Sequence, residues 1–206
     1  MSGRSGKFVW GLAVVVSSVL VSGSAYAQSA VTPRVEVSAL PGGATFFTER
    51  SGEPSFGSYA AAAAVTYNAN RFVGIEAEVG GNIGVSQNIN LSTGMKSVTP
   101  PHQLTFSGNV LGYVGGRDRR VVPYVTAGAG GLTLFDKAEV GVANTTTFFA
   151  GNAGGGLLAG ITDRVSLRVD YRFIAVASKT DAPAFFGRDD RFGHRITAGL
   201  TVNFGQ

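Results

Sequence analysis

His102 and His194 are the two imidazoles that could serve as general bases in nucleophilic catalysis. A serine hydroxyl becomes a nucleophile when an imidazole beside it takes its proton. His102 is followed by Gln-Leu-Thr and His194 by Arg-Ile, so neither forms a His-x-Ser pair. Cysteine is absent, which excludes thiolate nucleophiles, thiolate metal ligands and disulfides. We therefore expect that this protein is not an enzyme.

Three aspartates in one segment, Asp181, Asp189 and Asp190, could contribute to a calcium site. Calcium takes six to eight oxygen ligands, and the intervening Arg188 and Arg191 indicate ordinary surface charge instead. We predict no metal site and no cofactor.

Two glycine-rich runs, at 128–131 and 154–156, have the composition of a phosphate-binding loop. No Lys-Ser/Thr follows either run and no helix is predicted to begin there. The glycines are better explained as strand positions that allow close approach and curvature.

A third group of chemically interesting residues consists of charges at alternate positions of otherwise apolar segments. They are Glu36, Glu76, Glu78, Arg168, Asp170, Arg172 and Arg195. Four acids and three arginines are nearly balanced, which favours a network of ion pairs over an ion filter of one sign. The basic segment 117–120 could touch anionic headgroups, but we expect it to be a solvated turn.

Period-two alternation of apolar and polar residues predicts that the chain is all-β. It is clearest in Val165–Phe173, where every second residue is apolar and the others are Ser, Arg, Asp and Arg. Seven further segments have the pattern more or less strongly: Arg34–Phe47, Phe56–Tyr67, Val73–Val79, His102–Val114, Val121–Phe135, Thr147–Ile161 and Phe192–Phe204. The sequence therefore predicts eight strands.

The connections between these strands alternate in length. Short turns are expected at 68–71, 116–120 and 162–164, and longer loops at 49–55, 86–101, 136–146 and 178–191. In an up-and-down meander, every second connection emerges at the same end. This layout is typical of an eight-stranded antiparallel transmembrane β-barrel with short periplasmic turns.

A soluble lipocalin-like barrel is the alternative fold, with the faces reversed. The charged face is too polar for an apolar ligand cavity, and Tyr59–Val65 and Ala127–Leu132 have no side polar enough for bulk water. Both observations favour a lipid-exposed wall with a polar lumen. In that arrangement the third and seventh strands stand opposite each other, and long side chains from them could meet across the axis.

Residues 1–27 have the features of a secretory signal peptide, with a basic start, an apolar stretch and a small-residue end. The apolar stretch, residues 8–21, is too short for a membrane-spanning helix. We predict cleavage between Ala27 and Gln28, which leaves residues 28–206 as a single barrel domain.

The composition excludes other classes of protein. Charged residues make up only 15% of the chain, Gly is abundant at 30 residues, and the net charge is +4. These values argue against a disordered or nucleic-acid-binding protein.

Several stretches together resemble the outer-membrane β-barrel domain family, which includes the OmpA transmembrane domain, OmpX-like barrels and opacity-type surface proteins. They are the signal peptide, residues 123–130, residues 149–157, the Val165–Phe173 strand and the terminal Thr-Val-Asn-Phe at 201–204. The resemblance covers essentially all of residues 28–206. Unlike the usual pattern, the terminal aromatic Phe204 is followed by Gly205 and Gln206.

This resemblance implies an integral protein of the Gram-negative outer membrane. Its implied partners are outer-membrane lipids and lipopolysaccharide, and the barrel-assembly machinery and periplasmic chaperones during biogenesis. A structural, surface-interaction or narrow porin-like role is expected, with an extracellular ligand recognised through loops 86–101 and 178–191. No peptidoglycan-binding domain is expected after the barrel. The alternative is a lipid A-modifying enzyme of the eight-stranded type.

Overall fold

The computed structural model describes residues 34–48, 54–91, 94–140, 142–183 and 185–204. The predicted signal peptide and the Ala27–Gln28 junction lie outside these residues. The elements are β1 (Val35–Phe47), β2 (Phe56–Asn68), β3 (Val73–Gly84), β4 (Gln87–Leu91), β5 (Gly94–Val98), β6 (Gln103–Tyr113), β7 (Val121–Leu134), the 3-10 helix η1 (Ala138–Val140), β8 (Thr146–Gly160), β9 (Val165–Val176) and β10 (Arg191–Phe204).

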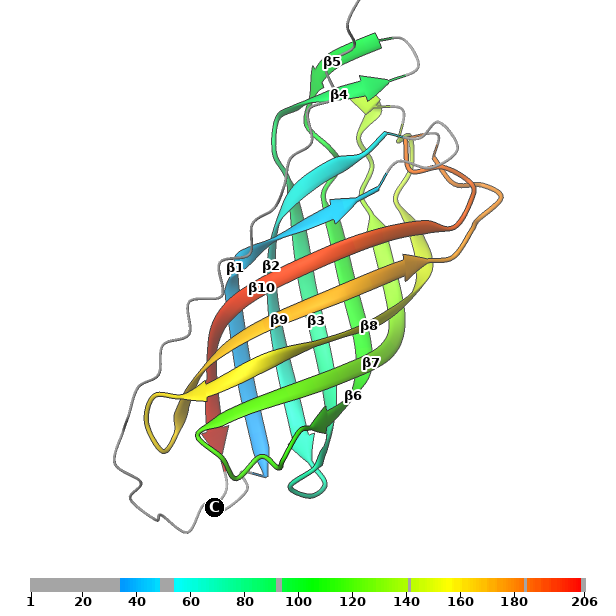
Figure 1. Ribbon diagram of the computed structural model, residues 1–206. Coiled ribbons are helices and arrows are strands. Elements are labelled where there is room, and N and C mark those ends of the chain that lie inside the picture. The colour runs from blue at the N-terminus through cyan, green and yellow to red at the C-terminus, as the bar shows by residue number, and fades with distance from the viewer. Residues whose placement is uncertain (1–33, 49–53, 92–93, 141, 184, 205–206) are drawn as a thin grey trace, which may run out of the picture.

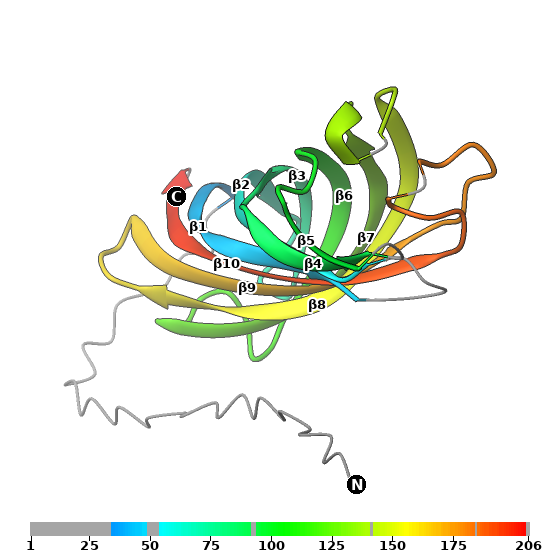
Figure 2. The ribbon, with the colours of Figure 1, turned by 90° about the horizontal axis from the view of Figure 1, so that it is seen from above.

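Eight of the strands form a closed antiparallel barrel in the order β1-β10-β9-β8-β7-β6-β3-β2 (Figures 1 and 2). Closure comes from the pairing of the first and last strands, which runs from Val35 opposite Phe204 to Phe47 opposite Gly193. The register shifts around Pro41, where β1 bulges. The eight predicted strands and the barrel fold are confirmed.

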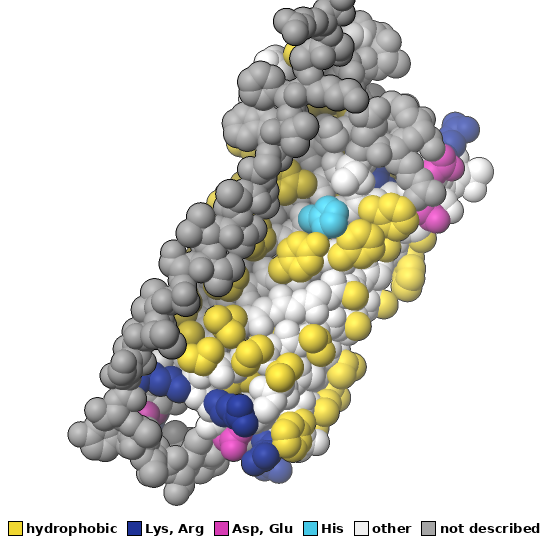
Figure 3. All heavy atoms as spheres, in the orientation of Figure 1, with side chains coloured by type: hydrophobic (Ala, Val, Ile, Leu, Met, Phe, Trp, Pro, Cys, Tyr) yellow, Lys and Arg dark blue, Asp and Glu magenta, His cyan; other side chains and the backbone are white. Residues whose placement is uncertain are grey.

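The alternating sequence pattern becomes two faces of the wall. In β9, Leu167, Val169 and Tyr171 are exposed on the outside, whereas Arg168 and Asp170 are buried inside. Hydrophobic side chains are spread over the outer wall in Figure 3. Polar groups lie inside and apolar groups outside, as expected of a wall that faces lipid.

The two ends of the barrel differ (Figure 1). Three short connections, after β2, β6 and β8, lie at the end where β10 terminates, and we call this the turn end. The connections after β1, β3, β7 and β9 lie at the opposite end, which we call the loop end. In the described part of the chain, no helix is long and apolar enough to cross a membrane.

Two expected loops contain additional structure. Residues 86–101 include the β4–β5 hairpin, which projects beyond the loop end of the barrel (Figure 1). Its alternation is weak because both faces are largely polar, so periodicity did not predict it. Gly94, which opens β5, has a φ of 108°, a conformation that glycine adopts without strain. The loop at 136–146 contains η1.

Candidate functional site

The inside of the barrel is filled with paired charges, beginning at the turn end. Arg117 enters the lumen from the connection between β6 and β7, and its Nε lies 2.6 Å from Oε1 of Glu36 on β1. The same carboxylate oxygen accepts a hydrogen bond from Asn68 at 2.9 Å, and Asn68 accepts one from Tyr113 at 2.6 Å. Arg117 is only 5% exposed, so the prediction that segment 117–120 is a solvated turn is wrong for this residue.

Farther from the turn end, Arg168 on β9 reaches across the lumen to Glu76 on β3. Its Nη1 lies 2.6 Å from Oε2 of Glu76, and its Nη2 lies 3.0 Å from Oδ2 of Asp170. The Nε of Arg168 donates to the Tyr124 hydroxyl at 2.9 Å, and this hydroxyl donates to Asp170 at 2.5 Å. The Arg168–Glu76 contact therefore joins opposite walls of the barrel.

Arg172 continues the network toward the loop end. It contacts Asp170 at 2.8 Å, Glu76 at 2.7 Å and Glu78 at 3.2 Å. Glu78 also lies 2.5 Å from Arg195 of β10. A carboxylate or guanidinium in a low-dielectric interior needs a partner to be tolerated. Here each of them has at least one.

We call these eight residues the charged layer: Glu36, Glu76, Glu78, Asp170, Arg117, Arg168, Arg172 and Arg195. All seven charged residues singled out from the sequence lie in it, and all are buried. Four acids and four arginines balance, once Arg117 is counted.

Neutral side chains complete the layer, and sequence reasoning did not identify them. Asn109 donates to Glu76 at 3.2 Å and accepts from Asn152 at 3.0 Å, while Asn152 accepts from Arg172 at 3.1 Å. The Tyr124 side chain fits into the lumen because the residue opposite it on β8 is Gly156. A Cβ at Gly156 would overlap the Tyr124 hydroxyl. Inward parity identifies these positions, but parity does not reveal which of them touch.

A small cavity lies where the charged layer ends. It has a volume of about 30 Å³ and is lined by Glu78, Ser107, Asn152, Arg172 and Arg195, among others. This space is enough for one or two water molecules. It is too small for a solute.

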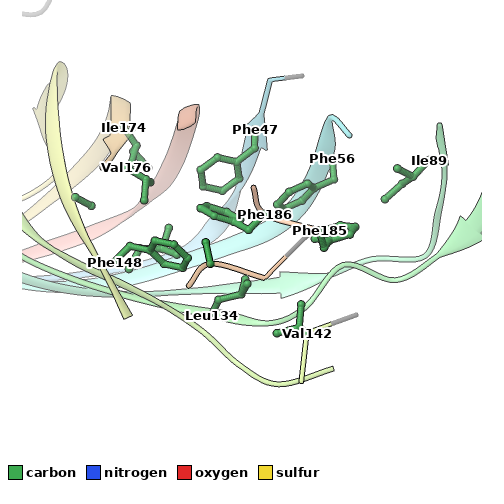
Figure 4. Close-up of a cluster of buried hydrophobic side chains, with 13 residues drawn as sticks. Phe47, Phe56, Ile89, Leu134, Val142, Phe148, Ile174, Val176, Phe185 and Phe186 are labelled. Carbon is green, nitrogen blue, oxygen red and sulfur yellow. The ribbon is translucent and has the colours of Figure 1, made fainter. Parts of the chain in front are cut away.

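An apolar cluster fills the barrel above this level, toward the loop end, and we call it the mouth cluster (Figure 4). Its residues are Phe47, Phe56, Ile89, Leu132, Leu134, Val142, Phe148, Ala150, Ile174, Val176, Ala182, Phe185 and Phe186. Phe186, from the connection after β9, packs with its ring centroid 5.4 Å from Phe47 and 5.0 Å from Phe148.

Arg191 anchors that connection. It is 2% exposed, and its guanidinium lies 5.2 Å from the ring centroids of Phe56 and Phe186. It donates to the carbonyl oxygens of Phe186 at 3.0 Å and of Pro54. The interpretation of Arg191 as ordinary surface charge is therefore wrong, because Arg191 is the first residue of β10 and has the inward parity of Gly193 and Arg195.

The two histidines lie away from the charged layer. His102 accepts a hydrogen bond from the backbone of Gly84 at 3.3 Å. His194, on the outward parity of β10, lies 2.8 Å from the Tyr171 hydroxyl and stacks on that ring. Asp181, Asp189 and Asp190 are exposed at the loop end.

A closed eight-stranded barrel with an apolar exterior and a polar, ion-paired interior defines a membrane barrel of the outer-membrane type. The sequence agrees: over residues 13–204 it matches the outer membrane protein beta-barrel domain, and the chain belongs to this family. No curated protein matches it.

Solved structures with the same fold are similar at low sequence identity. Neisserial surface protein A (NspA) is 14% identical with a TM-score of 0.56, covering 82% of this chain and 96% of its own. The N-terminal β-barrel domain of Pseudomonas aeruginosa OprF is 14% identical with a TM-score of 0.54, and the match covers 82% of this chain and 96% of that domain. OprG of Pseudomonas aeruginosa is 12% identical with a TM-score of 0.54, covering 85% and 97%. These likenesses concern the fold.

Proposed function

We propose that this protein is a plugged outer-membrane barrel that acts as a rigid scaffold for its loops and passes no steady ion current. The observation that carries the proposal is the charged layer, in which Arg168 and Glu76 close a 2.6 Å contact between opposite walls. An ion entering the lumen would have to separate these pairs, and an unpaired buried charge costs several kcal/mol.

Single-channel recording of the refolded protein in planar bilayers tests the proposal. We expect no steady conductance from the unchanged chain and a measurable leak from Glu76→Ala or Arg168→Ala. Leu167→Ala is the matched control, because Leu167 is the outward-facing neighbour of Arg168 and is 43% exposed. Large, stable currents from the unchanged protein would contradict the proposal and indicate a porin.

The loops supply the surface for an extracellular ligand. The loop 178–191 places Ala182, Phe185 and Phe186 in the mouth cluster. The β4–β5 hairpin buries Ile89 in the same cluster but projects beyond it, with Met95 76% exposed. Recognition is therefore proposed for the hairpin. Replacing residues 87–98 with a Gly-Ser linker should abolish adhesion of expressing cells and leave the barrel folded; unchanged adhesion would exclude this role.

The proposed route to the membrane rests on the expectations from the sequence. We propose export through a signal peptide cleaved before Gln28, delivery by periplasmic chaperones, insertion by the barrel-assembly machinery, and contact with outer-membrane lipids and lipopolysaccharide. The turn end then faces the periplasm. Intact-mass measurement of protein from outer membranes should give a chain that begins at Gln28; retention of Met1 would contradict processing.

A further inference from the structure

The turn end carries a ring of exposed arginines. Arg34, Arg71, Arg120 and Arg164 come from four different places in the sequence, one before β1 and one in each of the three turns. All four are exposed. Figure 3 shows Lys/Arg side chains gathered at this end, below the apolar wall.

The backbone fixes the height of each arginine. The carbonyl of Arg34 accepts from Asn68 at 2.9 Å, and that of Arg71 accepts from Arg117 at 2.7 Å. The carbonyls of Arg120 and Arg164 accept in the same way, from Gly160 at 2.7 Å and from Asn203 at 2.8 Å. Arg34, Arg120 and Arg164 thus each add one step to a strand ladder, whereas Arg71 is bonded to the turn between β6 and β7. All four stand at the rim.

These backbone hydrogen bonds also show how the arginines are spaced around the rim. In barrel order they lie at the β1/β2, β3/β6, β7/β8 and β9/β10 pairs, which is every second pair. We call the four residues the arginine rim. Arg119, from the same turn as Arg120, is a fifth exposed arginine at this end.

Few acids offset the arginine rim. Among the described residues at the turn end, Asp118 and Asp163 are the acids outside the charged layer, and Asp118 pairs with Arg71 at 3.4 Å. The described loop end is mixed instead, and Lys137 and Lys179 lie within 4.0 Å of an acid there. The excess of positive charge is therefore specific to the turn end.

Apolar side chains that face lipid lie directly beside the arginine rim. Phe72, next to Arg71, is 47% exposed, and the Arg71 guanidinium lies 4.5 Å from the centroid of its ring. Val121 follows Arg120 and is 52% exposed. An arginine that borders the apolar belt holds its charge at the level of the lipid headgroups.

We propose that the arginine rim binds the phosphates of anionic phospholipid headgroups in the leaflet that borders the turn end. Guanidinium groups recognise phosphate through paired N–H donors. A ring at headgroup height meets many lipids at once, whereas a soluble phosphate ion would meet one exposed arginine at a time. The rim would hold the barrel at a defined depth.

Spin-labelled lipids measure this preference. The refolded protein is placed in phosphatidylcholine vesicles, and electron paramagnetic resonance gives the protein-bound fraction of spin-labelled phosphatidylglycerol relative to spin-labelled phosphatidylcholine. We expect a preference of about threefold for phosphatidylglycerol, weakened by salt. The rim variant R34Q/R71Q/R120Q/R164Q should fall to a ratio near one.

A second variant provides the matched control. The control variant K96Q/K137Q/K179Q/R188Q removes the same amount of positive charge from the loop end, and it should keep the preference for phosphatidylglycerol. Both variants must show heat-dependent gel mobility, so that the folded state is established before lipid binding is compared.

Three outcomes would overturn the proposal. The first is a preference unchanged in the rim variant, or lost equally in the control variant. The second is loss of the preference on adding inorganic phosphate, which would assign the arginines to a free anion. The third is no preference for phosphatidylglycerol in the unchanged protein, which would indicate that the rim binds an acidic partner other than lipid. These results do not depend on conductance, so they test the arginine rim independently of the proposal that the lumen is plugged.

Discussion

The charged layer and the mouth cluster fill the same barrel by different means. In the charged layer, seven of the eight charged side chains come from strands, and only Arg117 comes from a turn. In the mouth cluster, strand residues such as Phe47 and Phe148 meet Phe185 and Phe186, which belong to the connection after β9. One region is closed by the wall itself. The other is closed mainly by the connection after β9, together with Ile89 and Val142 from two other connections.

This difference determines how each region can open. Strand side chains of the charged layer can separate only at the cost of buried, unpaired charges. The loop of the mouth cluster can withdraw while the strand ladder stays intact, because local opening needs less free energy than global unfolding. We therefore expect the charged layer to control passage and global stability, and the mouth cluster to control only the order of the loop.

Removal of Arg168 should have the largest effect on stability. Arg168→Ala leaves Glu76 and Asp170 short of a partner in the interior, and we expect a loss of about 3–5 kcal/mol in the free energy of unfolding. The double variant Arg168→Ala/Glu76→Ala restores the charge balance and should lose less. Urea titrations of the refolded protein in lipid measure both.

The exposed loop-end residue Arg188 is the control for this experiment. Arg188→Ala should leave the free energy of unfolding unchanged within about 0.5 kcal/mol. A double variant less stable than Arg168→Ala alone would show that the charged layer is not a set of coupled pairs.

The next largest effect tests the two faces of one strand. Val169 lies between Arg168 and Asp170 in β9, but it faces outward and is 37% exposed. Val169→Arg places a charge against lipid and should cost about 2–4 kcal/mol if the site is near the bilayer midplane. No loss in refolding titrations would mean that the outer face does not contact lipid.

Truncation of Phe186 tests the mouth cluster. Phe186→Ala removes a ring that packs on Phe47 and Phe148. The connection after β9 should lose about 3 kcal/mol of local stability, the lower end of the range for a buried Phe, because a loop can collapse into the space. We expect faster hydrogen exchange in residues 185–190, with the strands and the absence of current unchanged. Phe149→Ala is the control, since Phe149 faces outward and is 66% exposed. A leak from Phe186→Ala would show that the mouth cluster, and not the charged layer, blocks the passage of ions.

The same contrast explains what the sequence could predict. Period-two alternation places Glu76, Arg168 and Arg172 on the inner face, because parity in a strand determines the direction of a side chain. It also places Arg191, which opens β10 with the inward parity of Gly193 and Arg195, although the predicted strand began one residue later. It cannot place Arg117, since the position of that residue follows from how a turn folds over the barrel end. The β4–β5 hairpin was missed for a related reason: its strands leave no strongly apolar face to reveal them.

Two ion pairs at the turn end allow the finest comparison, because one is buried and the other is exposed. Arg117 and Glu36 lie 2.6 Å apart with side chains only 5% and 3% exposed, whereas Arg71 and Asp118 lie 3.4 Å apart and are 54% and 29% exposed. Solvent screens the second pair, so Asp118→Asn should change the free energy of unfolding by less than about 1 kcal/mol, with any loss disappearing at high salt. Glu36→Gln should cost several times more and depend little on salt, because it leaves the Arg117 guanidinium in the lumen without a carboxylate. Urea titrations at two salt concentrations measure both variants, and equal losses would show that burial does not govern the strength of ion pairs in this barrel.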